Sequence, residues 1–396
     1  MVTPPPAEVE FIVSACLMVV TAVLGITAAR HRHHLASIPI RIHVNGTRGK
    51  SSVTRLIAAG FRAAGYRTIA KTTGTAARLI LEDETEYDLE RASAACIREQ
   101  FDVVRHASER HAEVLVIECM AIKPEFQLAS QESIVQGTCS VVTNVRPDHQ
   151  EEMGETLEEI GWSMAAVAPQ GGILVTAEEN PKLVAMLERR AARVGGRVVC
   201  SDVTCAPTNE DFGRVEFAEN IALALKVCEL HGIGREVALE GMRNAAPDPG
   251  VMQTTHMEVE GTKLCFVNAF AANDYDSTEK IINDVREQVN GGGLYLVVSC
   301  RADRPRRTVA MAKLLGNGSN LSGAFVIGDG GELLQRLVKR QGLDLPVCAL
   351  SDHDPERMLS EIGLNVKDGA HVVGVGNIAG SAQALCDRVT QGALLS

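Results

Sequence analysis

The stretch Ile38–Ser52 constrains the fold of this chain more than any other part of the sequence. Apolar, mostly β-branched residues alternate with other residues in its first half, which predicts a strand. A glycine turn at Asn45–Gly49 follows, and Lys50 then opens a helix that we expect to run towards Ala64. A strand, a glycine turn and a helix N-terminus together form a cradle of backbone N–H groups for an anion.

The cradle resembles a phosphate-binding loop, although a shortened one. The usual pattern has a glycine five residues before Gly49, and Val44 occupies that position. Lys50 is predicted to reach the β- and γ-phosphates of a nucleotide, and the Ser51 hydroxyl to bind Mg²⁺. A short glycine–lysine turn by itself is equally compatible with a simple strand–helix connection. The residues predicted to contact nucleotide are Asn45, Gly46, Thr47, Arg48, Gly49, Lys50, Ser51 and Ser52.

Composition limits the possible number of domains, the class of protein and its partners. A chain of 396 residues has room for two domains, and 45% hydrophobic with 22% charged residues is typical of a globular protein. The net charge of −11 argues against nucleic acid as a partner, because binding phosphate backbones needs a basic face. The 11 cysteines are scattered and never spaced as Cys-x-x-Cys, which favours free thiols in a reducing cytosol.

The N-terminal residues 1–37 are predicted to be a membrane anchor with a basic flank. Phe11–Ala29 carries no charge and is long enough, as a helix, to cross the hydrocarbon core of a bilayer. Glu8 and Glu10 precede this run, whereas a secretory signal would place lysine or arginine there. The basic cluster Arg30–His34 follows it, which indicates a single pass through the cell membrane and a cytoplasmic body. A buried N-terminal helix is the alternative.

Strand and helix signals alternate through residues 38–250, which predicts a domain with a parallel sheet. Such sheets bind ligands beyond the carboxyl ends of their strands. Glu118 ends the apolar run 113–118, and His149 closes a loop that follows the strand predicted at Ser140–Asn144. The cradle, Glu118 and His149 are therefore expected at one edge of the sheet.

Phosphoryl transfer gives this convergence a chemical reason. Mg²⁺ neutralises phosphate charge and takes oxygen ligands, and a carboxylate that ends a buried strand is well placed to hold it. We therefore predict Ser51, Glu118 and His149 as metal ligands, with His149 binding a second metal or a phosphate. The simpler alternative is that Glu118 and His149 only cap their strands and satisfy loop amides.

Residues 251–396 are predicted to form a second α/β domain. A hairpin is expected around Glu260-Gly261, and strand and helix signals then alternate to the C-terminus. The strand predicted at Leu294–Val298 leads into four arginines, a local inversion of charge in an acidic protein. Guanidinium groups bind carboxylates and phosphates bidentately. A solvated surface run is the alternative. The arginines are Arg301, Arg304, Arg306 and Arg307.

Several ordered motifs resemble those of the Mur ligase superfamily, which includes the folylpolyglutamate synthetases. They are the loop His43–Ser52, the segment Thr143–His149, the helix segment Glu219–Ala224 and the turn Pro247–Gly250. A closer resemblance is to the membrane-associated, ATP-dependent ligase subunits of poly-γ-glutamate (capsule) synthases. It rests on Lys71–Ala76, Glu118–Pro124, Val267–Asp274 and Arg301–Arg304, and it covers nearly the whole chain.

The resemblance implies the architecture and the activity. The expected fold is α/β, with an N-terminal membrane anchor, a central P-loop-type parallel-sheet ATPase domain and a C-terminal Rossmann-like domain. ATP and Mg²⁺ would serve to activate a terminal carboxylate of poly-γ-glutamate as an acyl phosphate, which glutamate then attacks. Other integral-membrane synthase subunits and a homo-oligomer are the implied partners. Catalytic roles fall to Lys50, Glu118, His149, Arg301 and Arg304, and further nucleotide contacts to Asn220, Asn273 and Asp274.

Departures from the superfamily pattern keep other functions open. Only the anchor precedes the cradle, so a nucleotide-sugar substrate is not expected. Val251 and Met252 follow Gly250 where relatives carry an arginine. A folylpolyglutamate-type or other polyglutamate ligase is one alternative. A membrane-tethered NTPase that energises polymer assembly or export is another, and it would not need glutamate to release ADP.

Overall fold

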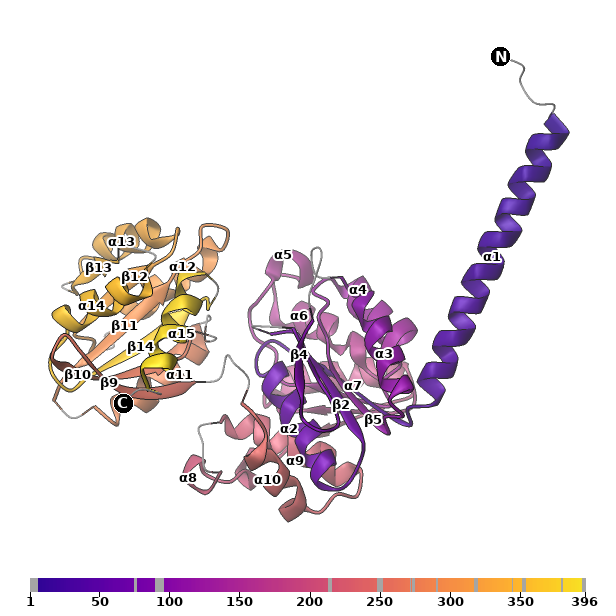
Figure 1. Cartoon of the computed structure of the whole chain (residues 1–396), viewed down its shortest axis with the longest axis horizontal. Helices are drawn as coiled ribbons and strands as arrows, with labels where there is room; N and C mark the ends of the chain where they lie inside the picture. The colour runs from indigo at the N-terminus through magenta and orange to yellow at the C-terminus, as the bar shows by residue number, and fades with distance from the viewer. Residues whose placement is uncertain are drawn as a thin grey trace. The chain divides into compact units, whose positions relative to one another are not determined.

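The chain forms two compact units (Figure 1). The first comprises Met1–Phe212 with Phe217–Ala246, and the second comprises Gly213–Glu216 with Pro247–Ser396. The computed structural model describes residues 6–74, 77–89, 96–212, 216–247, 252–270, 272, 275–289, 291–316, 320–343, 345–350, 354–378 and 380–393.

The first unit is built on an eight-stranded sheet of order β4-β3-β2-β5-β1-β6-β7-β8. The central strand β1 pairs in parallel with β5 on one side and β6 on the other. Both faces of these strands are buried, which explains their near-continuous apolar sequences. The strands are β1 Ile40–Asn45, β2 Thr68–Thr72, β3 Arg78–Ile80, β4 Glu86–Asp88, β5 Val114–Glu118, β6 Cys139–Val142, β7 Ile173–Thr176 and β8 Arg197–Cys200.

Helices cover both faces of this sheet. On one face α2, α9 and α10 pack around Phe61 and Met242. On the other face α6 and α7 form one cluster, and α3, the π-helix η1 and the end of α1 form another. The helices are α1 Pro6–Ala36, α2 Lys50–Ala63, α3 Glu99–Glu109, α4 Pro124–Ala129, η1 Ser130–Val135, α5 Gln150–Met153, α6 Leu157–Met164, η2 Ala165–Val167, α7 Pro181–Arg193, η3 Val203–Cys205, α8 Asn209–Phe212, α9 Ala218–Leu230 and α10 Arg235–Asn244.

The second unit has a six-stranded sheet of order β13-β12-β11-β14-β10-β9. Helices α11, α12 and α13 cover one face, and α14 and α15 cover the other. The elements are β9 Gln253–Val259, β10 Thr262–Asn268, α11 Tyr275–Arg286, β11 Leu294–Ser299, α12 Pro305–Gly316, β12 Gly323–Ile327, α13 Gly331–Arg340, β13 Val347–Ala349, α14 Pro355–Asn365, β14 Ala370–Gly376 and α15 Ser381–Ala393.

The expectation of a parallel sheet in the first unit is wrong at one edge, because β3 and β4 run antiparallel. They are short and form a meander with β2, in which Leu79 and Ile80 are buried. The sheet of the second unit is also mixed, since β9 pairs antiparallel with β10 in the hairpin predicted around Glu260. The composition of residues 91–107 is typical of a helix, and within the described residues helix α3 begins at Glu99.

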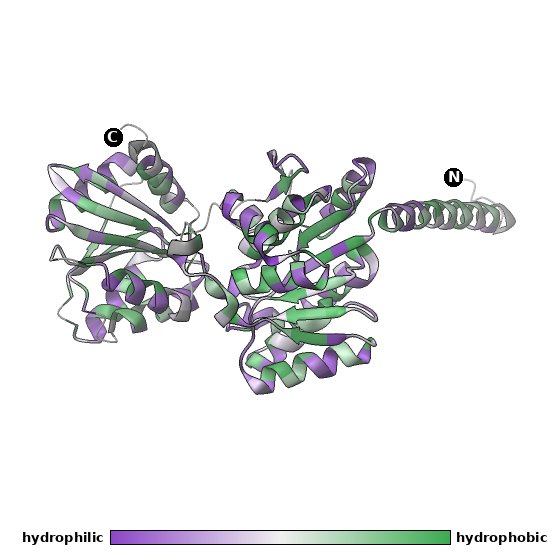
Figure 2. Ribbon diagram, turned by 90° about the horizontal axis from the view of Figure 1, so that it is seen from below, coloured by the Kyte–Doolittle hydropathy of each residue, from purple (hydrophilic) through white to green (hydrophobic). Residues whose placement is uncertain are grey.

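The first strand also begins two residues later than predicted. Helix α1 continues to Ala36, and Ile38 lies in the connection to β1. Pro39 has no N–H and cannot donate to the sheet, so pairing starts at Ile40. The segment of α1 from Glu10 to Ala36 is long and apolar enough to cross a membrane, and its most apolar window is not buried against the protein. Figure 2 shows most of α1 and the strands of both sheets as hydrophobic.

We predict that Gly241→Ala destabilises the first unit. A Cβ atom at Gly241 on α10 would lie 2.4 Å from the carbonyl oxygen of Ala59 on α2, so the two helices must separate. Such overpacking costs about 1–3 kcal/mol, more than alanine gains in helix propensity. The neighbouring exposed substitution Glu240→Ala is the control and should leave the denaturant midpoint unchanged. Equal midpoints for both variants would contradict the close packing of α10 on α2.

Candidate active site

Glycines shape the phosphate turn, the predicted phosphate-binding residues 45–49 between β1 and α2. Gly46 has φ of 130°, and a Cβ atom there would lie 2.0 Å from Oγ1 of Thr143. Gly49 has φ of 79°, and a Cβ atom there would lie 2.4 Å from Oδ1 of Asn220. Both positions therefore require glycine on grounds of backbone conformation and of space. The second contact also brings Asn220 of α9, predicted as a nucleotide ligand, directly against the turn.

The segment after β6 holds this turn in place. Backbone N–H of Thr47 donates to the carbonyl oxygen of Asn144 at 3.1 Å, and backbone N–H of Arg48 donates to the Asn144 side chain at 3.1 Å. The Thr143 hydroxyl donates to the carbonyl oxygen of Arg48 at 2.6 Å. The motif Thr143–His149 thus supports the turn through its first two residues, which lie in a loop because β6 already ends at Val142.

Lys50 folds back over the turn. Its Nζ lies 2.8 Å from the carbonyl oxygen of Gly46 and 3.3 Å from that of Thr47. The ammonium group therefore lies over the N-terminus of α2, where the helix dipole already favours an anion. This position fits the predicted role of Lys50 in contacting phosphate.

Ser51 and Glu118 come together at the end of the central strands. The Ser51 hydroxyl donates to Oε2 of Glu118 at 2.8 Å, and the backbone N–H of Thr73 donates to the same oxygen at 2.7 Å. The strand register explains this meeting, because Val44, six residues before Lys50, pairs with Glu118 across β1 and β5. Both side chains are buried, Glu118 with only 2% of its surface exposed.

This pair fits a divalent cation with few protein ligands. Hydroxyl and carboxylate oxygens are the donors that Mg²⁺ prefers, and Mg²⁺ usually keeps several waters and binds phosphates as well. Among the residues that the structure describes, no group of three or more His, Cys, Asp and Glu side chains is arranged to hold a metal. A site of Ser51, Glu118 and phosphate oxygens is consistent with both observations.

His149 lies in a different local environment. It has φ of 46° at the start of α5, and its ring nitrogens lie 3.9 Å from carboxylate oxygens of Asp148 and Glu152. Asp148 in turn lies 3.5 Å from the Arg48 guanidinium on the turn. His149 is therefore linked to the phosphate turn through Asp148, and a metal-binding role for it stays a prediction.

Sequence reasoning missed a layer of buried polar residues beneath the turn. Lys71 on β2 is fully buried, and its Nζ lies 2.7 Å from Oε1 of Glu99 on α3. His43 on β1 is also fully buried, with Nδ1 lying 2.8 Å from Oε1 of Gln131 on η1. Burial, with a smaller contribution from Lys71, lowers the pKa of His43 to about 4. Polar side chains inside otherwise apolar strands were the available signal.

Asn45 belongs to the same buried layer. Its Nδ2 donates to Oε1 of Gln127 at 2.7 Å and to the carbonyl oxygen of Met164 at 3.1 Å. The side chain thus ties β1 to the helical layer, and only its backbone faces the turn. Asn273 and Asp274, predicted as nucleotide ligands, lie outside the described residues.

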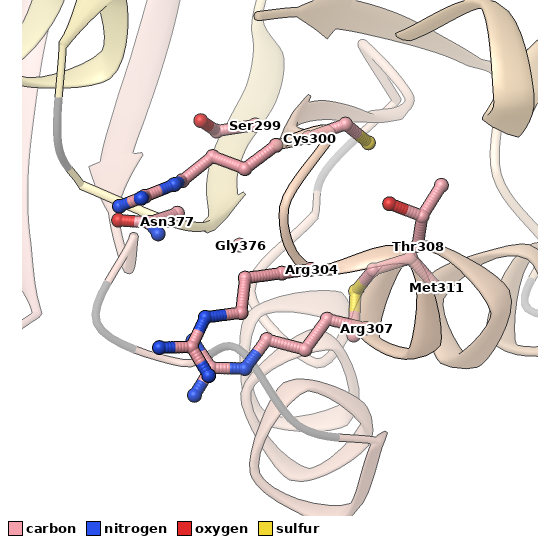
Figure 3. Close-up of a pocket in the computed structure, with 9 residues that line it drawn as sticks. Ser299, Cys300, Arg304, Arg307, Thr308, Met311, Gly376 and Asn377 are labelled. Carbon is pink, nitrogen blue, oxygen red and sulfur yellow. The ribbon is translucent and has the colours of Figure 1, made fainter. Parts of the chain in front are cut away.

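The second unit has its own pocket, at the carboxyl ends of β11 and β14 (Figure 3). These strands are neighbours, and the helices that follow them, α12 and α15, cover opposite faces of the sheet. Such a switch point is where open α/β sheets usually bind ligands. The lining residues are Ser299, Cys300, Arg301, Arg304, Arg307, Thr308, Met311, Gly376 and Asn377.

The arginines of this pocket differ in their surroundings. Arg301 forms a bidentate pair with Asp303, at 2.8 and 2.6 Å, and this pairing lowers the pKa of the Asp303 carboxyl. Arg304 and Arg307 also line the pocket, whereas Arg306 is exposed and does not. The cluster predicted from sequence is therefore divided: Arg301, Arg304 and Arg307 line the pocket, and Arg306 does not.

Two family models match the chain. Residues 44–199 match the Mur ligase middle domain, and residues 254–392 match the poly-gamma-glutamate synthase CapB C-terminal domain. The first match contains the phosphate turn, Glu118 and His149, and the second contains the arginine pocket. The resemblance inferred from the motifs is confirmed.

Curated relatives and solved structures agree with these matches. The capsule biosynthesis protein CapB of Bacillus anthracis is 35% identical, covering 97% of this chain and 83% of the relative. The PGA synthase CapB of Bacillus subtilis is 34% identical, covering 96% of this chain and 97% of the relative.

The fold is similar to a folylpolyglutamate synthase/dihydrofolate synthase of Yersinia pestis solved with AMPPNP and Mn. The TM-score is 0.69 and the identity 17%, over 91% of this chain and 92% of that one. The folylpolyglutamate synthase of Thermotoga maritima gives a TM-score of 0.60 at 16% identity, over 95% and 97%. The phosphate turn, the two domain matches and the full-length relatives together place this chain in the CapB family of poly-γ-glutamate synthases, ATP-dependent amide ligases of the Mur ligase and folylpolyglutamate synthase type.

Proposed function

We propose that this chain activates the terminal carboxylate of a poly-γ-glutamate chain as an acyl phosphate and joins it to glutamate. The carboxylate oxygen bonds to the γ-phosphorus of ATP, and ADP leaves. The glutamate amine then attacks the acyl carbon, the tetrahedral intermediate expels phosphate with the former carboxylate oxygen, and the nitrogen loses a proton. The observation that carries this proposal is Ser51 hydrogen-bonded to the buried Glu118 beside the Lys50 turn.

Each residue of the turn has a role in this proposal. Backbone N–H groups of the turn and the first helical residues bind the phosphates, and Lys50 moves from the Gly46 carbonyl to the β- and γ-phosphate oxygens. Ser51 and Glu118 hold Mg²⁺, which when bound neutralises charge on the transferred phosphoryl group. Asn220 supports the turn at Gly49. His149, which lies beside Asp148, binds the phosphate or a second metal.

The pocket of the second unit is proposed to bind the substrate carboxylates. Glutamate chains carry one carboxylate per residue, and a protein of net charge −11 repels them unless it offers a locally basic site. Arg304 and Arg307 line the pocket beside Asn377, and guanidinium groups pair with carboxylates bidentately. Arg301, already paired with Asp303, positions the loop, and Arg306 steers substrate from outside the pocket.

A membrane location and further subunits complete the proposal. Helix α1 anchors the protein in the cell membrane with the catalytic units in the cytoplasm, and other integral-membrane synthase subunits and a second copy of the chain are the partners. The domain limits proposed for anchor, ATP-binding and ligase parts are 1–37, 38–250 and 251–396. A solved folylpolyglutamate relative holds L-glutamate with AMPPNP, which keeps other polyglutamate substrates as the second candidate. A measurement of ADP release with and without glutamate tests the alternative, because a simple NTPase would release ADP without glutamate.

We predict that Lys50→Ala lowers glutamate-dependent ADP release by about 10²–10³-fold, the usual effect of removing one preorganised charge contact. Lys50 lies half-buried at the surface of the turn, so the fold should survive its loss. The exposed Lys182→Ala on α7 is the matched control and should keep wild-type turnover. Wild-type ADP release from folded Lys50→Ala protein would refute the assignment of the phosphate turn.

Glu118→Gln should raise the Mg²⁺ concentration needed for half-maximal activity, or abolish activity. The amide oxygen can still accept the hydrogen bond from Thr73, but it carries no charge to hold the cation. Glu178→Gln is the control, because Glu178 also follows a strand and accepts a backbone hydrogen bond, from Val145 at 3.1 Å. If the Mg²⁺ titrations of both variants overlay that of wild type, Glu118 is only a strand cap.

Removing the apolar part of α1 should release the protein from membranes. The cut belongs before Arg30, because Leu35 is buried in the first unit and His31 contacts η1. Residues 30–396 should then be soluble and folded, whereas the full chain should sediment with membranes and resist extraction by salt. Full-length protein that stays in the soluble fraction of its host would refute the anchor.

A further inference from the structure

Phe101 on α3 is an exposed aromatic residue beside the root of α1. It leaves 38% of its surface open to solvent, and its ring meets the ring of His31 edge-on, with centroids 4.6 Å apart. The uncharged run of α1 ends at Ala29, only two residues before His31. At a rise of 1.5 Å per residue, His31 lies about 3 Å beyond the apolar run along the helix.

This spacing sets the depth of Phe101 if α1 crosses a bilayer. The polar headgroup layer on each side of the hydrocarbon core is roughly 5–8 Å thick. A residue about 3 Å past the apolar run lies within that layer, and the ring in contact with it lies at a similar level. Phenylalanine is among the residues by which surface helices insert at the boundary between headgroups and acyl chains.

The junction between α1 and the first unit is fixed rather than hinged. Helix α1 is continuous to Ala36, and Nε2 of His31 lies 2.8 Å from the carbonyl oxygen of Ile134 on η1. Nδ1 of His34 lies 3.0 Å from the Ser108 hydroxyl on α3. The Arg41 guanidinium donates to carbonyl oxygens on both sides of the junction, including Leu35 at 3.1 Å and Gln136 at 3.0 Å.

The same contacts give the direction of α3. His31, nearer the apolar run, meets Phe101 at the start of α3, while His34, further from it, meets Ser108 near its end. The N-terminal turn of α3 therefore points towards the membrane side. Exposed Arg98 precedes this turn, and exposed Arg30 and Arg32 flank His31 in the sequence of α1, so this end of the unit carries basic residues. The nearby Asp102 carboxylate is paired with Arg105 at 2.8 Å.

We infer that the start of α3, with Phe101 and Arg98, is a second membrane contact that inserts into the headgroup layer of the leaflet facing the catalytic units. The inference rests on the proposed membrane crossing by α1. Phe101 supplies the apolar contact, and the arginines face anionic headgroups. Together with the fixed junction, this contact holds the first unit in one orientation against the lipid surface.

Fluorescence quenching by brominated lipids tests the depth of Phe101 in the full-length chain. Trp162 is the single tryptophan, so Trp162→Phe gives a silent background. On that background, Phe101→Trp in vesicles of phosphatidylcholine and phosphatidylglycerol should lose fluorescence when the acyl chains are brominated near the headgroups. Phe217→Trp is the matched control, since Phe217 is 37% exposed at the start of α9, and it should not be quenched.

A tryptophan in the anchor separates the two proposals. Leu24→Trp lies within the apolar run and should be quenched most strongly by bromines deep in the chains. If Leu24→Trp is quenched while Phe101→Trp behaves like Phe217→Trp, the second contact is refuted and the anchor stands. If Leu24→Trp is not quenched, α1 does not cross the bilayer, and both the anchor and the contact built on it are refuted.

Discussion

The hydrogen bond from Ser51 to Glu118 joins the parts of the first unit on which its chemistry depends. Ser51 belongs to the first turn of α2, and Glu118 ends β5. Thr73, just after β2, donates to the same carboxylate oxygen. One buried anionic group thus fixes three loops at the carboxyl edge of the sheet. The two hydrogen bonds donated to Oε2 offset the cost of burying this polar side chain.

Each unit offers a locally positive site at the carboxyl ends of its strands, but the groups that form the two sites differ. In the first, a helix N-terminus, Lys50 and a buried carboxylate suit a metal-bound polyphosphate. In the second, the pocket at the β11–β14 switch point is lined by arginines and suits carboxylates. If the proposed sites are right, this acidic protein keeps its local positive charge where anionic substrates would bind, while its net charge of −11 repels them elsewhere.

Much of the first unit could be predicted from the sequence, because its determinants are local. Alternating apolar residues indicate β1, and Gly46 and Gly49 indicate the turn that follows it. A carboxylate after an apolar run indicates the end of β5. None of these signals requires knowledge of the tertiary structure. The sequence predicted Ser51 and Glu118 at one edge of the sheet, but not their direct hydrogen bond. That bond depends on the register of Val44 against Glu118 across two strands far apart in sequence. Strands β3 and β4, the last two strands on one side of the sheet, escaped prediction because strands of three residues have almost no periodicity.

The arginine cluster shows a different limit of prediction from sequence, which concerns the partners of individual side chains. Four positive charges within seven residues indicate an anion site, but Asp303 lies among them and forms an ion pair with Arg301. Likewise Lys71 and Glu99 lie 28 positions apart, and nothing local predicts that they pair in the interior. Side-chain partners that come from different elements are fixed by tertiary packing, which a local pattern does not describe.

Gln100 is the neighbour of Phe101 on α3, and its side chain donates to the carbonyl oxygen of Glu118 at 3.4 Å. One helix therefore lies between the strand end that is proposed to hold the metal and the surface that is proposed to touch lipid. A helix with its side chains is about 10–12 Å across. If both proposals hold, a polymer end under extension would stay in a thin layer above the bilayer, and it would reach an integral-membrane synthase subunit by a short lateral movement along the surface instead of a search through the cytoplasm.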